Sequence, residues 1–164
     1  MYVYNQHRLI ILNLLSLCVL ILANGPWEML AQQCGRPSLQ RDARIVNGVA
    51  VSGSAGLMIN KNNLTLGTDE LISIAYDLSA LTSPAIKFSY SGASLNTFPM
   101  NEVNVYYSND CGEIWRTLGS LTNVQVANAG LYTTNFRPTA SEWNDTVMTK
   151  NQLKNDNIRF KFEY

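Results

Sequence analysis

The sequence predicts an all-β domain, an antiparallel β-sandwich of the jelly-roll type, and three observations support this prediction. From about residue 50 onward, Gly, Ser, Thr and Asn separate short segments that are rich in β-branched and aromatic residues. Several of these segments alternate apolar and polar residues with a period of two, as strands with one buried face do. No segment shows a convincing helical period. A chain of 164 residues is long enough for one such domain.

Three segments show the alternation most clearly, at residues 84–92, 102–108 and 157–164. The apolar residues that share their predicted buried faces are Ile86, Phe88 and Tyr90, then Val103, Val105 and Tyr107, then Ile158, Phe160, Phe162 and Tyr164. Weaker strand patterns occur at residues 69–79, 113–121 and 130–136. The segment closest to a helical pattern is 141–153, but its Asn and Thr residues make it a poor helix.

The sequence given ends at Tyr164, inside the last of these patterned segments. A strand that has only begun to pair is an unusual place for a domain to stop. We therefore expect a sandwich that lacks its last strand.

A nearly unbroken apolar run at residues 9–23 predicts a secretory signal peptide, because the run is short for a membrane span. The small residues at 23–25 offer one cleavage position, although Pro26 hinders it, and Leu30-Ala31 before Gln32 offers another. We assign residues 1–31 to the signal peptide and expect a secreted, extracellular protein. An uncleaved signal anchor is the alternative.

Charge and composition narrow the range of partners. Twelve basic and twelve acidic residues balance, and no basic patch stands out. Nucleic acid is therefore not expected as a partner. Beyond the signal segment, we expect no contact with a membrane.

The cysteines and two sequons suggest extracellular modifications. Cys18 lies in the predicted signal, which leaves Cys34 and Cys111. These two can form one disulfide in an oxidising compartment, or Cys111 can be a buried reduced thiol. Asn63 and Asn144 each begin an Asn-x-Thr pattern for N-glycosylation.

Residues 34–49, "CGRPSLQRDARIVNGV", resemble the pro-segment of a trypsin-like serine protease. The resemblance implies cleavage between Arg44 and Ile45. We assign residues 32–49 to such a pro-segment or to a linker that precedes the domain at 50–164.

The catalytic chemistry of such a protease is missing from the sequence. The serine protease mechanism needs a histidine to take the proton of the nucleophile. The only histidine is His7, within the predicted signal, and a His-Glu-x-x-His zinc motif is absent as well. A glycosidase that uses two carboxylates stays open on composition alone. We therefore predict that the chain is not an enzyme.

Several separated blocks in the body of the chain resemble the MAM-like jelly-roll module of secreted bacterial pappalysin-like metalloproteases. These blocks are "SGSAGLMINKNNLTLGTDELISIAYDLSALTSPAIKFSYSGA", "VYYSNDCGEIW" and "FRPTASEW…NIRFKFEY". The resemblance implies a jelly roll at residues 50–164 that is truncated at its C-terminus, since the family continues into a final strand with paired Asp residues. It also implies an accessory role beside a catalytic domain.

Two candidate ligand sites follow. Related jelly rolls often hold calcium near a sheet edge, which places Asp69 and Glu70 as calcium ligands; an exposed acidic turn is the alternative reading. Trp143, which follows a turn, is the candidate ligand-facing aromatic residue, whereas Trp115 is expected in the core or half-buried.

The sequence thus favours a secreted, non-catalytic β-sandwich that serves adhesion, ligand binding or substrate positioning as the accessory of a metalloprotease. A protein or a glycan is the expected ligand, and calcium is the possible cofactor. The alternative is a fragment of a secreted trypsin-like protease precursor, or of a metalloprotease, whose catalytic domain lies outside this sequence.

Overall fold

The computed structural model describes residues 7–13, 34, 38–39, 43–51, 53, 55–62, 68–94, 102–122, 124–132 and 136–164. Both predicted signal cleavage positions and Asn63 lie outside these residues. In the described parts of the chain, no helix is long and apolar enough to cross a membrane.

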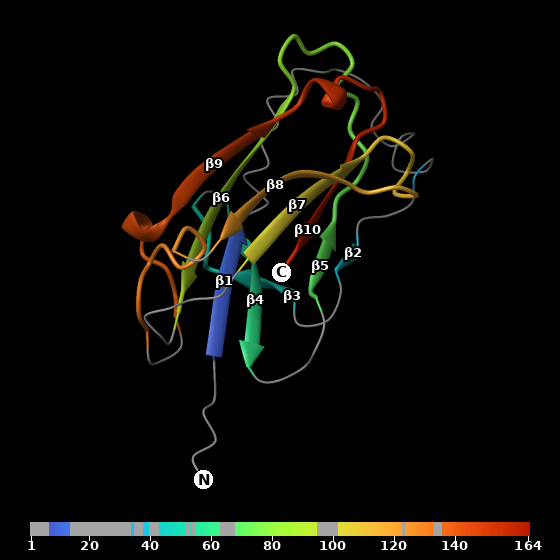
Figure 1. Cartoon of the computed structure of the whole chain (residues 1–164). Helices are drawn as coiled ribbons and strands as arrows, with labels where there is room; N and C mark the ends of the chain where they lie inside the picture. Colours follow the sequence, from blue (N-terminus) through green and yellow to red (C-terminus); the bar gives the residue numbers. More distant parts are fainter. Residues whose placement is uncertain are drawn as a thin grey trace.

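Two five-stranded antiparallel sheets make up the fold (Figure 1). In spatial order, sheet A contains β3 (Ala43–Asn47), β4 (Ala55–Asn62), β1 (His7–Asn13), β6 (Ala85–Ala93) and β9 (Asn144–Thr149). Sheet B contains β2 (Ser38–Leu39), β5 (Glu70–Ile72), β10 (Arg159–Glu163), β7 (Glu102–Ser108) and β8 (Arg116–Thr122). Two short 3₁₀ helices flank β9: η1 (Ala140–Glu142) and η2 (Asn151–Leu153). The predicted all-β class and antiparallel sandwich are confirmed.

The main core lies between the two sheets and contains the three predicted apolar faces. Phe88 of β6 and Phe162 of β10 meet edge to face across the core, with ring centroids 5.0 Å apart. All of the residues predicted for these faces are buried: Ile86, Phe88, Tyr90, Val103, Val105, Tyr107, Ile158, Phe160, Phe162 and Tyr164. Local alternation was sufficient to predict them because each of these strands has one face on the core.

The outer face of sheet A carries a smaller apolar cluster, which we call the second cluster. Its buried members are Val49, Ala93 and Phe136, and Val46, Met58, Ala129, Tyr132 and Trp143 pack against them. The second cluster therefore covers part of the outer face of sheet A, whereas the Lys87–Asp145 ion pair of β6 and β9 is exposed.

Five strands were not foreseen, namely β1, β2, β3, β4 and β9. β9 lies within residues 141–153, the segment whose sequence is closest to a helical pattern. β1 comes from the apolar run predicted as a signal peptide. Residues 9–12 are apolar without a break, so the segment lacks the alternation that marks a half-buried strand and resembles the core of a signal peptide.

Two predicted strands are shorter than expected. The segment 69–79 forms strand only at Glu70–Ile72, followed by a single bridge between Tyr76 and Ile158. In the segment 130–136 the described residues contribute one bridge, from Leu131 to Ser94.

Candidate functional site

The outer face of sheet B carries a cluster of charged and aromatic side chains. Along β10, Phe160 and Phe162 point into the core, so the residues between and after them point outward. The outward residues are Lys161 and Glu163, and β5 supplies Glu70 beside them. Lys161 Nζ lies 3.1 Å from Glu70 Oε1 and 3.0 Å from Glu163 Oε2.

Two aromatic rings border this ion triplet. Lys161 Nζ lies 4.8 Å from the ring centroid of Tyr106, on β7, and 5.7 Å from that of Trp115. The Tyr106 hydroxyl donates to Glu163 Oε1 at 3.4 Å. We call Glu70, Tyr106, Trp115, Lys161 and Glu163 the Lys161 cluster. All five residues are half-buried, so they combine an ordered arrangement with access to solvent.

Electrostatics keep the centre of the Lys161 cluster positively charged. Burial lowers the pKa of Lys161, but the hydrogen bonds and charges of Glu163 and Glu70 outweigh burial and raise the pKa above its ordinary value. The pKa of Tyr106 is raised, first by burial and then by the negative charge of Glu163. The ammonium and the phenol are therefore both protonated at neutral pH.

The turn between β7 and β8 places Trp115. Asp110 Oδ1 accepts hydrogen bonds from Ser108 Oγ at 2.5 Å and from the Ile114 N–H at 3.0 Å. Gly112 has a φ of +96°, and a Cβ at that position would lie 3.2 Å from the Trp115 ring. The turn thus needs glycine for its backbone conformation and for its close approach to the indole.

A disulfide ties this turn to the N-terminal part of the chain. Cys34 and Cys111 are bonded, with their Cα atoms 4.6 Å apart, so the disulfide alternative applies and the reduced thiol does not. The buried guanidinium of Arg159 lies beneath the bond. It donates to the carbonyls of Cys34 at 2.6 Å, Cys111 at 3.1 Å and Ser73 at 3.0 Å.

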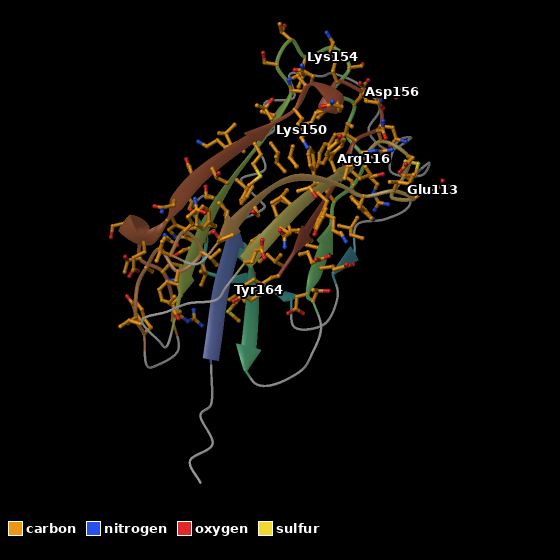
Figure 2. All side chains as sticks on the ribbon, viewed as in Figure 1. Glu113, Arg116, Lys150, Lys154, Asp156 and Tyr164 are labelled. Carbon is orange, nitrogen blue, oxygen red and sulfur yellow. A yellow bond between two sulfur atoms is a disulfide. The ribbon has the colours of Figure 1, made fainter. Side chains whose placement is uncertain are left out.

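Burial lowers the pKa of Arg159, although a guanidinium stays protonated. Figure 2 shows Glu113 and Arg116 at this end of sheet B, away from Tyr164. The turn that carries Trp115 is therefore held by two links: the disulfide from Cys111 to Cys34 and the hydrogen bond from Arg159 to the carbonyl of Cys111.

Protonation of Asp110 is expected to loosen this turn. Its pKa is lowered first by the Ser108 hydroxyl, then by the Ile114 N–H, with a smaller contribution from Arg116. A depressed folded-state pKa means that the carboxylate stabilises the turn fully above its ordinary pKa of 3.8, and that this contribution is lost as pH falls through the lower, folded-state value. The Ile114 amide resonance should therefore shift with a midpoint below pH 3.8.

The matched control for this titration is Asp110→Asn. The amide side chain has no proton to gain in this range, so the acid step at Ile114 should disappear. A step that persists in the variant would assign the titration to another group.

The predicted calcium ligands do not converge in the structure. Asp69 is 1 % exposed, and its backbone exchanges hydrogen bonds of 2.8 and 2.9 Å with Tyr164. Its neighbour Glu70 binds Lys161 instead, because successive residues of an extended chain point to opposite sides. Among the described residues, no three His, Cys, Asp or Glu side chains form a group that could hold a metal ion.

The other predicted site residues have different positions. Trp143 packs against the second cluster on sheet A, so the aromatic residue that borders a charged face is Trp115. Asn144 is exposed at the start of β9. Arg44 and Ile45 lie within β3, at the edge of sheet A, where they pair with Met58 and Leu57 of β4.

Comparison with known proteins identifies no relative of this chain. No family model matches it, no curated protein matches it, and no solved structure matches it.

Sequence reasoning overlooked the Lys161 cluster, although one signal for it was available. The alternation in residues 157–164 places Lys161 and Glu163 together on the polar face of a strand. The pairing of that strand with Glu70 and Tyr106, from segments far apart in the sequence, is not encoded in any local pattern.

Proposed function

We propose that this chain is a secreted, non-catalytic β-sandwich module that binds an uncharged glycan on the outer face of sheet B. The observation that carries the proposal is the Lys161 cluster. Its aromatic rings offer apolar surfaces for the C–H face of a pyranose. Its carboxylates and ammonium accept and donate hydrogen bonds with hydroxyl groups.

Charge favours a neutral glycan over an acidic one. Two carboxylates and one ammonium leave the Lys161 cluster with a net charge of about −1. An anionic polysaccharide would be repelled at short range, whereas a neutral one would not.

Two arguments support secretion and an accessory role. Disulfides persist in oxidising compartments, and the bond between Cys34 and Cys111 fits an extracellular protein. The sequence resemblance to the MAM-like modules of metalloproteases extends the proposal: the glycan-binding face would position a catalytic domain on its substrate or on a surface.

The arrangement of the carboxylates favours binding over catalysis. A glycosidase needs its two carboxyl groups on either side of the scissile bond. Glu70 and Glu163 instead hold the same ammonium from two sides. The rival proposal, a fragment of a protease precursor, predicts hydrolysis of casein or of an arginyl ester by the secreted protein.

Replacing Trp115 by alanine is expected to weaken glycan binding about tenfold, equivalent to about 1.4 kcal/mol, because the stacking surface is lost. The measurement is affinity electrophoresis of the full chain in gels that contain hydroxyethylcellulose, mannan or starch, with alginate as the anionic comparison. The wild-type protein should be retarded by at least one neutral polymer and not by alginate.

Trp143→Ala is the matched control, because it removes an indole that packs against the second cluster, away from the Lys161 cluster. Circular dichroism should show both variants folded. Equal retardation of the Trp115 and Trp143 variants, or no retardation of the wild-type protein by any neutral polymer, would contradict the proposal.

A further inference from the structure

Strand β1 has a central position in sheet A. It makes six register pairs with β4 and five with β6, all antiparallel. If these seven residues are absent, sheet A separates into the pairs β3–β4 and β6–β9 (Figure 1). Strands β4 and β6 would then lie two strand spacings apart, roughly 10 Å. The backbone groups that pair with β1 would be unpaired on both strands.

Apolar residues flank this position on both faces of the sheet, and the buried Ser89 and Ser91 of β6 join them on one face. Leu57 and Tyr90 flank it on the side of the main core. Met58 and Ala93 flank it on the side of the second cluster. An occupant therefore needs apolar side chains opposite Leu57, Tyr90 and Ala93, whereas the buried hydroxyls of Ser89 and Ser91 on β6 accept polar ones.

One polar group in this position is unsatisfied. Ser91 of β6 is fully buried, and its hydroxyl has no hydrogen-bond partner among the described residues. Its register partner in β1 is Ile11. Because a buried hydroxyl without a partner costs about 1–3 kcal/mol, an occupant with a hydrogen-bonding side chain at this register would bind better than β1 does.

The residues of β1 overlap the predicted signal peptide at 1–31. Secretion with removal of the signal would leave the position between β4 and β6 empty. A second processed copy cannot fill it with the same strand, because that copy has lost residues 7–13 as well.

We propose that the position between β4 and β6 is a strand-acceptor site for another polypeptide. Its occupant is an extended segment of at least six residues, apolar opposite Leu57, Tyr90 and Ala93, with Ser, Thr or Asn opposite Ser91. Backbone hydrogen bonds on two sides supply affinity, and the Ser91 hydroxyl supplies specificity. This inference rests on the proposed secretion and signal removal, but not on glycan binding.

The first test is to express the full chain in a secreting host and to determine the N-terminus and mass of the exported protein. The expected product lacks residues 7–13. An exported protein that retains them has filled the position with its own strand, and this result would overturn the proposal.

The second test adds a synthetic peptide of residues 7–13, with two lysines appended for solubility, to the processed protein. The peptide should bind one-to-one and raise the melting temperature. The Ile10→Pro peptide should not bind, because proline cannot donate within a central strand. A processed protein that is a sharply melting monomer or dimer without the peptide, or that stays aggregated with it, would contradict the inference.

The third test examines specificity. An Ile11→Thr peptide should bind about tenfold more tightly than the Ile11 peptide, and Ser91→Ala in the acceptor should abolish this preference. Equal affinity of the two peptides for the wild-type acceptor would overturn the assigned role of Ser91. Polysaccharide retardation of the same preparation reports separately on the Lys161 cluster, so the two proposals can fail independently.

Discussion

Replacing Cys34 and Cys111 by serine is expected to lower the free energy of unfolding by about 4 kcal/mol. The disulfide joins residues 77 apart in sequence, and a cross-link of that span removes much of the conformational entropy of the unfolded chain. Arg159 adds to the expected loss, since its guanidinium donates to the carbonyls of both cysteines and depends on their position. Urea denaturation of the two proteins would measure the difference.

Cys18→Ser is the matched control, because it removes a cysteine from the predicted signal peptide and leaves the disulfide in place. This variant should unfold at the same urea concentration as the wild-type protein. If the double variant loses less than about 1 kcal/mol, the N-terminal segment is held by its other contacts and the disulfide has little effect on stability.

The consequence for glycan binding is also testable on the double variant. Cys111 lies in the turn that carries Trp115, so loss of the disulfide should weaken polysaccharide binding even where the protein remains folded. A variant that is destabilised but binds normally would show that Asp110 and Gly112 are sufficient to place the indole.

Phe88→Ala is expected to lower the free energy of unfolding by about 4 kcal/mol. The ring is fully buried and meets Phe162 edge to face, so its removal leaves a cavity at the contact between the two sheets. Thermal or urea unfolding would measure the loss.

The matched control lies on the neighbouring strand. Val147 in β9 is paired in register with Lys87 and is 60 % exposed, so Val147→Ala should change stability by less than about 0.5 kcal/mol. If Phe88→Ala and Val147→Ala lowered the free energy of unfolding by similar amounts, this result would contradict a core that lies between the two sheets.

The two proposals concern different faces of one sandwich. The Lys161 cluster lies on sheet B, and the strand-acceptor site lies in sheet A. A partner strand that completes sheet A would stabilise the core that sheet B shares. Binding of the partner would then raise the stability of the glycan-binding face without touching it.

Alternation in the sequence by itself determined β6, β7 and β10 and the residues they bury. Each of these strands alternates apolar core residues with more polar ones, and that difference is visible within five to nine residues. It also determined that Lys161 and Glu163 point away from the core.

Only the tertiary structure decided which side chains meet. Glu70 reaches Lys161 because β5 pairs with β10, and Trp115 reaches the same ammonium because the turn after β7 folds back. Pairing between distant strands depends on the packing of the whole sandwich, so no local pattern predicts it. The same holds for β1, since residues 9–12 are all apolar and lack the alternation by which a half-buried strand is recognised in the sequence.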